Sequence, residues 1–299
     1  MKPVDFSAKH DILIRHMDGK LTPMDEPYYE VTKLNDSTWQ IMSSGDYHYL
    51  LAGDEEAVAI DTGYGAGNLR EFLENLCGLP VKCVINTHHH FDHTANNCYF
   101  DLAYMAKEAV PLASIPYASF EGVEFPRDYK IQIVDDGFVV PLKGRELEIF
   151  RCGDHTEDGI AILDRKYRML FTGDEIMFHM KTLNGTVQKW KEDLDKIAVC
   201  RDAFDIVCGG MGMENAEVFD IFREAATKIY AGETSAEEEP KHEPPKMELP
   251  DTDGHKVYDC KMPHPEDRPK AGFFKESPDM VTFVYKGRVF KYDKTKLYN

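Results

Sequence analysis

A histidine-rich segment placed directly after an apolar run is the feature that most restricts how this chain can fold. The segment is Thr87-His88-His89-His90-Phe91-Asp92-His93, and the short β-prone run 81–85 precedes it. A buried strand of this kind delivers the segment into a loop at a strand end, where a rigid scaffold usually presents chemical groups. Imidazole and carboxylate side chains are typical ligands of zinc, so we predict a divalent metal site here. Its candidate ligands in this segment are His88, His90, Asp92 and His93.

The residues on both sides of this segment predict a mixture of strands and helices. Runs 38–42, 47–51 and 57–60, separated by turn residues, indicate an antiparallel meander. Apolar residues at i, i+3, i+4 and i+7 predict a helix from Leu69 to Leu76, which Gly78 ends. We therefore expect α/β layers with two sheets. Later in the chain we predict strands at 147–150, 160–163, 169–171 and 204–207 and a helix over 187–198.

The composition changes after Ala231. Acidic residues and prolines are frequent in the following stretch, which indicates a solvated linker. Beyond it, runs 280–285 and 289–292 flank a short turn and predict a β-hairpin. We therefore divide the chain into an N-terminal segment (1–30), a main domain (31–231), a linker (232–255) and a C-terminal extension with the hairpin (256–299).

The formal net charge of −18 restricts the partners of this chain. Binding to a nucleic-acid backbone requires clustered Lys and Arg, and an anionic membrane surface disfavours an acidic protein. The seven cysteines are irregularly spaced without a Cys-x-x-Cys pair, and the first residues contain no apolar run. We therefore expect a cytoplasmic protein with a small-molecule substrate and no nucleic-acid or membrane partner. The sequence leaves a homo-oligomer open.

Four motifs in one order resemble those of the metallo-β-lactamase superfamily. Thr-His-x-His-x-Asp-His after a strand is the first, and Asp61-Thr62-Gly63 resembles the family's turn before its first helix. His155-Thr156 resembles the context of the third histidine, and Gly173-Asp174 resembles that of the bridging aspartate. The resemblance covers roughly residues 35–230 and implies an α/β fold, the four-layer αββα metallo-β-lactamase sandwich, here with a C-terminal β-hairpin extension.

The resemblance also implies a role for each matching residue. His88, His90 and His155 would bind a first metal ion, and Asp92 and His93 would bind a second. Asp174 would bridge the two ions. The implied cofactor is zinc, as one or two ions, with iron as an alternative. The side chains of His89 and Phe91 would point elsewhere.

The sequence departs from the family pattern at one ligand. The family's last histidine usually lies in a Gly-His-Gly turn, and Met211 stands there in this chain. A thioether is a poor ligand for zinc, so the second site is weakened. It is then empty, degenerate, or completed by another group. The candidates for such a replacement are Glu175, His179, Cys208, His255 and His264.

The resemblance implies a metal-dependent hydrolase that uses a metal-bound hydroxide on an ester, thioester, lactone or phosphoester. Asp92 would be the catalytic residue that orients the nucleophile or moves its proton. Two alternatives stay open. The first is a mononuclear iron sulfur dioxygenase, which the weakened second site would suit. The second is a metal-poor binding protein that retains only the fold.

Overall fold

The computed structural model of the chain describes residues 3–16, 19–43, 46–235, 237–238, 252–259 and 277–299. The backbone forms two compact units, each with its own sheets and its own core. Unit 1 contains residues 1–133, 142–145 and 244–273, and unit 2 contains the remaining residues, 134–141, 146–243 and 274–299. The predicted main domain is therefore shared between the two units, and most of the predicted linker lies outside the described residues.

Unit 1 is built on a mixed sheet of seven strands in the order β3-β4-β5-β6-β7-β8-β9. Strands β3 to β6 pair antiparallel, and β6 to β9 pair parallel. The three runs of the predicted meander form β4, β5 and β6, and β3 adds a strand that was not predicted. Parallel neighbours need crossover connections, and the first of these contains α1. The strands are β3 (Glu30–Asn35), β4 (Thr38–Ser43), β5 (Asp46–Ala52), β6 (Ala57–Ile60), β7 (Cys83–Ile85), β8 (Leu102–Met105) and β9 (Lys130–Ile133).

Helix α1 (Leu69–Cys77) forms where the apolar spacing predicts it. The side chain of Asn68 accepts a hydrogen bond from the backbone N–H of Glu71, which caps the first turn. Leu69 and Leu73 are buried, and Gly78 ends the helix in the left-handed conformation at φ +73°. The second helix of unit 1, α2 (Phe91–Thr94), belongs to the histidine-rich segment.

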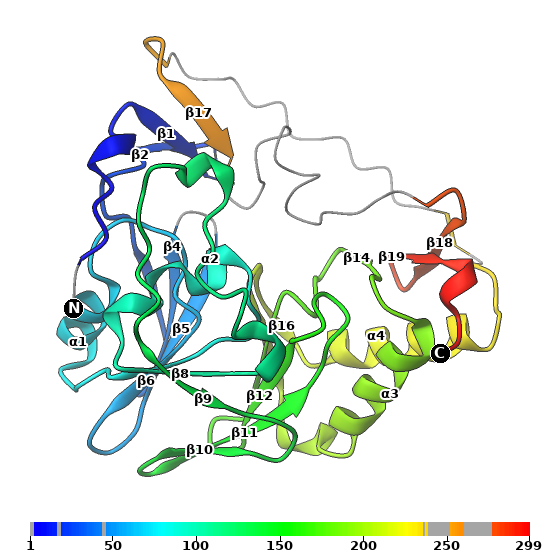
Figure 1. Cartoon of the computed structure of the whole chain (residues 1–299). Helices are drawn as coiled ribbons and strands as arrows, with labels where there is room; N and C mark the ends of the chain where they lie inside the picture. The colour runs from blue at the N-terminus through cyan, green and yellow to red at the C-terminus, as the bar shows by residue number, and fades with distance from the viewer. Residues whose placement is uncertain (1–2, 17–18, 44–45, 236, 239–251, 260–276) are drawn as a thin grey trace. The chain divides into compact units, whose positions relative to one another are not determined.

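A second, smaller sheet in unit 1 joins residues far apart in the chain. Strand β17 (Lys256–Asp259) pairs parallel with β1 (Ile12–Arg15), which pairs antiparallel with β2 (Leu21–Pro23). Figure 1 shows β17, in orange, alongside the blue N-terminal strands. Strand β1 therefore has a defined place in a sheet, although no local pattern predicts its pairing with β17.

Unit 2 is built on a six-stranded sheet in the order β10-β11-β12-β13-β15-β16. Two helices, α3 (Val187–Ala198) and α4 (Glu217–Tyr230), lie side by side (Figure 1) and bury Trp190 and Phe222 in the core of the unit. The strands are β10 (Val139–Leu142), β11 (Arg145–Arg151), β12 (Ile160–Asp164), β13 (Met169–Gly173), β15 (Ile206–Gly209) and β16 (Gly212–Asn215).

The predicted C-terminal hairpin is present and belongs to the core of unit 2. Strands β18 (Met280–Tyr285) and β19 (Arg288–Asp293) pair antiparallel, and β19 also pairs parallel with β14 (Met180–Thr182). The ring of Phe290 is fully buried, 5.8 Å from Trp190 and 5.0 Å from Phe222 between ring centroids. The hairpin therefore contributes to the hydrophobic core of this unit.

Short 3₁₀ helices connect several of these elements. In unit 1 they lie at Ser7–Lys9, Ala95–Tyr99, Lys107–Ala109 and Ala118–Phe120, and in unit 2 at Arg201–Ala203 and Lys294–Lys296.

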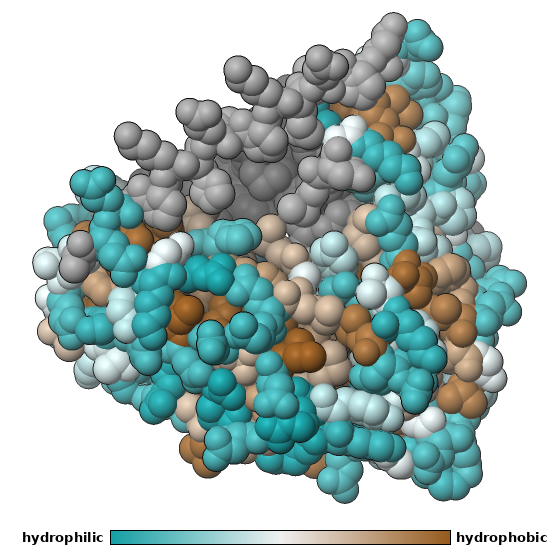
Figure 2. Space-filling view, turned by 180° about the vertical axis from the view of Figure 1, so that it is seen from behind, coloured by the Kyte–Doolittle hydropathy of each residue, from teal (hydrophilic) through white to brown (hydrophobic). Residues whose placement is uncertain are grey.

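Figure 2 shows the hydropathy of one face of the molecule. On the face seen in Figure 2, teal residues dominate and hydrophobic residues form small separate patches. Among the described residues, no helix is both long and apolar enough to cross a bilayer.

Candidate metal centre

Unit 1 gathers the four ligand candidates of the histidine-rich segment beyond the end of β7. His88, Asp92 and His93 are buried, and His90 is half-buried. The ring centroids of His88 and His93 are 4.1 Å apart, and those of His88 and His90 are 4.7 Å apart. Three imidazole rings therefore lie in close contact at the point where β7 ends and α2 begins.

Asp61, at the end of β6, holds Thr87 and the ligand candidate His93 through its carboxylate. Its Oδ1 accepts a hydrogen bond from the backbone N–H of Thr87 at 2.7 Å. Its Oδ2 lies 2.7 Å from the Thr87 hydroxyl and 2.8 Å from Nδ1 of His93. Asp61 also has a left-handed backbone at φ +59°, an uncommon conformation for a residue with a side chain. Such strain is typical of functional positions.

These hydrogen bonds determine which ring nitrogens face the site. The Asp61 carboxylate only accepts, so the Thr87 hydroxyl and His93 Nδ1–H both donate to it. The Thr87 hydroxyl has then used its proton, and it accepts a hydrogen bond from Nδ1 of His88 at 3.1 Å. Both histidines therefore keep the Nε2 lone pair as the metal-binding atom. A carboxylate behind a metal-binding histidine commonly fixes its tautomer in this way.

Asp92 faces both His93 and a tyrosine. Its Oδ2 lies 3.9 Å from Nε2 of His93, and its Oδ1 accepts a hydrogen bond from the hydroxyl of Tyr117 at 2.9 Å. A separation of 3.9 Å is too long for a hydrogen bond but suits two ligands of one ion, given metal–ligand bonds of about 2.0–2.2 Å. The donors of unit 1 therefore fit a divalent cation.

The side chain of Phe91, the first residue of α2, packs into the aromatic core of unit 1. Its ring is 1% exposed, and its centroid lies 4.7 Å from that of Phe125 and 4.9 Å from that of Phe120. On the other side, the amide of Asn86 donates to the backbone oxygen of His93 at 3.0 Å. Aromatic packing and a buried amide thus fix the backbone that carries Asp92 and His93.

The other two predicted ligands, His155 and Asp174, lie in unit 2. His155 follows β11, and Asp174 follows β13. Nε2 of His155 lies 3.9 Å from Oδ2 of Asp174, the same separation as in the pair in unit 1. Both side chains are only 12–13% exposed. That these two residues bind the same metal centre as the ligands of unit 1 stays a prediction.

A buried ionic network, which the sequence pattern does not reveal, supports the loop that carries His155. Oε2 of Glu175 accepts hydrogen bonds from the backbone N–H groups of Asp154 and His155 at 3.1 and 2.7 Å. Lys181, fully buried on β14, lies 3.0 Å from Glu175 and 3.1 Å from Asp154. Burial raises the pKa of Glu175 to about 7, although the charge of Lys181 opposes this shift. Burial lowers the pKa of Lys181, but the charges of Glu175 and Asp154 outweigh that effect and the net shift is upward.

The structure shows the surroundings of the residues that could replace the family's last histidine. Met211 lies between β15 and β16, where the family turn is expected. Glu175 is engaged with Lys181, and burial raises the pKa of the Cys208 thiol far above its usual range, which disfavours the thiolate. His255 is exposed, and its Nδ1 lies 3.0 Å from the backbone oxygen of Asp11.

Two further candidates are His179 and His264. His179 lies beside the hairpin, where its backbone oxygen accepts a hydrogen bond from the N–H of Val289. His264 lies outside the described residues.

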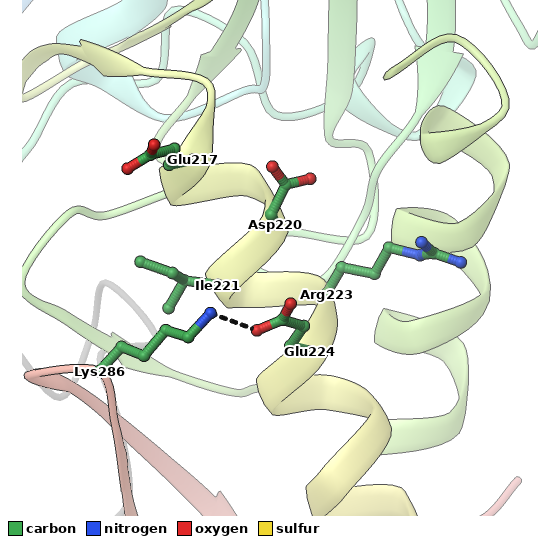
Figure 3. Close-up of a pocket in the computed structure, with 6 residues that line it drawn as sticks. All are labelled: Glu217, Asp220, Ile221, Arg223, Glu224 and Lys286. Carbon is green, nitrogen blue, oxygen red and sulfur yellow. Dashed lines mark hydrogen bonds and ion pairs between the residues drawn. The ribbon is translucent and has the colours of Figure 1, made fainter. Parts of the chain in front are cut away.

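A pocket on α4, shown in Figure 3, lacks the groups for this chemistry. The described residues of its lining include no His or Cys, and the ammonium of Lys286 is paired with Glu224 at 2.7 Å. The other lining residues are Glu217, Asp220, Ile221 and Arg223. The histidine-rich segment therefore stays the predicted site.

Comparison with known proteins identifies the family. Residues 47–207 match the family described as the metallo-beta-lactamase superfamily. This match covers more than half of the chain and includes all six predicted ligands. The chain therefore belongs to the metallo-β-lactamase superfamily, and the predicted family is confirmed.

Three proteins are similar to this chain in sequence. It is 25% identical to the beta-lactamase-like protein 2 homolog of Caenorhabditis elegans, over 56% of this chain and 59% of that protein. It is 27% identical to the human acyl-coenzyme A thioesterase MBLAC2, over 54% of this chain and 68% of that protein. It is 26% identical to the hydroxyacylglutathione hydrolase of Prochlorococcus marinus, over 50% of this chain and 58% of that protein. The chain thus spans less than two thirds of the first and third relatives, and the second and third are named as hydrolases.

A solved structure supports the fold. The metallo-beta-lactamase from Pontibacter korlensis aligns with a TM-score of 0.51 and 19% identity, over 67% of this chain and 99% of that one. Together with the family match, this confirms the predicted α/β metallo-β-lactamase fold class.

Proposed function

We propose that this chain is a metal-dependent hydrolase of thioesters. The observation that carries the proposal is the buried pair of His88 and His93, both oriented by the carboxylate of Asp61. This arrangement presents two Nε2 atoms with defined tautomers, beside the carboxylate of Asp92. It is a preorganised set of donors for zinc.

We further propose that His90 and His155 complete the first metal site and that Asp174 bridges to the second. Support comes from the order of the motifs and from the family match, which includes both segments. The 3.9 Å separation between His155 and Asp174 also suits two ligands of a shared ion.

Individual residues of unit 1 would then have separate roles in hydrolysis. A bound divalent ion would lower the pKa of a water molecule and polarise the scissile carbonyl. Asp92 would hold the second ion and orient the water beside it, because the hydroxyl of Tyr117 holds Oδ1 and leaves Oδ2 facing the site. Asp61 would keep His88 and His93 in place through turnover.

The names of the relatives favour thioesters over the other substrates. One relative is named as an acyl-coenzyme A thioesterase and another as a hydroxyacylglutathione hydrolase, and in both the bond named is an acyl group on a thiol.

A substrate panel tests the proposal. Purified protein is assayed on acyl-coenzyme A and acyl-glutathione thioesters, a lactone and a phosphodiester, each with and without a chelator. We expect chelator-sensitive release of free thiol, with smaller or no turnover of the other two substrates. Chelator-sensitive turnover of the lactone or phosphodiester alone would replace the thioester assignment.

The metal content separates this function from the two alternatives. Elemental analysis is carried out on protein purified without added metal. Zinc supports the hydrolase, whereas a single iron ion would support the sulfur dioxygenase, for which Met211 is the relevant departure from the family pattern. Protein without metal and without turnover after zinc addition would support a binding protein that retains only the fold.

A further inference from the structure

Asp46 is a buried carboxylate that the family motifs do not include. It is the first residue of β5, where it pairs with Ser43 of β4. Its side chain is only 1% exposed. One ligand atom each of Asp46, Asp92 and His93 lies within 4.8 Å of the others. All three residues belong to unit 1 and all three are buried.

We propose that Asp46 is a metal ligand that completes the second site together with Asp92 and His93. The proposal rests on the metal centre of the proposed function and deepens it. The family's usual ligand at the second site is a histidine, and this chain has Met211 at that position. A carboxylate from β5 would then replace a thioether with an oxygen donor, which zinc accepts readily.

The electrostatics of the cluster favour a cation between these residues. Asp46 and Asp92 are 1% and 6% exposed, so their charges are poorly screened by water. Two carboxylates so close together in a dry site repel each other unless a proton or a cation is shared between them. Nε2 of His93 also faces this position, because its Nδ1 donates to Asp61. An ion would satisfy both carboxylates and the imidazole lone pair at once.

His48 is a second buried group on the same side of β5. It lies two residues after Asp46, so the two side chains share one face of the strand. His48 is 1% exposed, and neither ring nitrogen has a hydrogen-bond partner among the described residues. A Cβ atom added to Gly63 would lie 3.4 Å from its Nδ1 and 3.2 Å from the Ser43 hydroxyl. The ends of β4 and β5 therefore pack closely on the turn that begins with Asp61, which orients His93.

Metal stoichiometry tests this assignment directly. Metal-free protein is titrated with Co²⁺, the absorption of the bound ion is followed, and the bound metal is counted by elemental analysis. We expect two equivalents in the wild type. In Asp46→Asn we expect one, or a second equivalent bound at least about tenfold more weakly. Asp92→Asn should lose the same equivalent. The matched control is Asp36→Asn, in an exposed turn of the same sheet, which should keep both.

Thermal unfolding distinguishes a ligand from a purely structural residue. Without metal, Asp46→Asn should unfold at the same or a higher temperature than the wild type, because the repulsion with Asp92 is removed. With saturating zinc, the variant should gain less in melting temperature than the wild type, because it binds one ion fewer. A structural role predicts instead a loss of stability in both states with unchanged stoichiometry.

Two outcomes would overturn the proposal. One is an Asp46→Asn variant that binds two equivalents with wild-type affinity. The other is a wild type that binds a single equivalent at saturation, since Asp46, Asp92 and His93 would then form no second site. A wild type that binds two ions but does not hydrolyse thioesters would contradict the proposed function and leave the assignment of Asp46 intact.

Discussion

At the scale of single residues, Asp61 organises the candidate site without being a predicted ligand. Its two oxygens accept the backbone N–H and the hydroxyl of Thr87 and the Nδ1–H of His93. Through Thr87 it also orients His88. One carboxylate therefore orients a ligand of each proposed metal ion, from a residue with a left-handed backbone.

Substituting Asp61 tests this role. Asp61→Asn keeps the shape of the side chain but replaces one acceptor oxygen with an NH₂ donor, so it loses at least one of these bonds. We expect zinc affinity to fall by about 10–100-fold, as for other carboxylates behind metal-binding histidines. Competition with a chromophoric chelator measures this change. A variant with wild-type zinc affinity would remove Asp61 from the metal centre.

Tyr117 offers a second test at this scale. Tyr117→Phe removes the hydroxyl that lies 2.9 Å from Oδ1 of Asp92. A hydrogen bond to a charged group contributes about 1.5–3 kcal/mol, so a role in orienting Asp92 predicts that kcat falls about tenfold or more. The bound metal should be unchanged. Steady-state kinetics and elemental analysis on the same preparation measure both quantities, and an unchanged kcat would contradict the role assigned to Tyr117.

The sequence predicts some of these residues and not others for a physical reason. His88, His90, Asp92 and His93 are visible because four ligand types within one short segment are unusual. Asp46 lies two strands earlier and looks like an ordinary turn residue. Only the pairing of β5 in the sheet brings it to Asp92 and His93.

At the scale of elements, the C-terminal hairpin is connected to the loop of His155. Strand β19 pairs with β14, and β14 carries Lys181. Lys181 contacts Glu175 and Asp154, and Glu175 accepts hydrogen bonds from the backbone of Asp154 and His155. The hairpin thus supports a predicted metal ligand through a short series of contacts within unit 2.

Removing the central lysine tests this connection. Lys181→Met keeps the length of the side chain but leaves Glu175 and Asp154 without their buried cation. We expect a loss of about 3–5 kcal/mol in the free energy of unfolding, since breaking a buried ion pair leaves uncompensated charge. Lys189→Met is the control, because Lys189 is 48% exposed and its pair with Asp193 should contribute about 1 kcal/mol or less. Denaturant unfolding measures both variants. Equal losses would show that the buried network has no special role.

Local patterns predict α1 and the hairpin because their causes are local. The spacing of leucines and the cap Asn68 define the helix, and Lys286 and Gly287, both at positive φ, form the two-residue turn of the hairpin. The pairing of β1 with β17 has no such local cause, since it joins residues more than 240 positions apart. The sequence therefore predicts the individual elements better than their partners.

At the scale of the whole molecule, the predicted ligands are distributed between the two units. Unit 1 contributes the segment from His88 to His93, and unit 2 contributes His155 and Asp174. The family match covers both. If the chain is a metal-dependent thioester hydrolase, a histidine from either unit is required for both metal binding and turnover.

The most direct test measures bound zinc and thioester turnover together in His88→Ala and His155→Ala, with circular dichroism to confirm that each variant folds. His10→Ala, at an exposed position, serves as the control. The account predicts that both variants lose first-site zinc and thioester turnover, while the control keeps both. Full turnover by either variant without bound metal would contradict it.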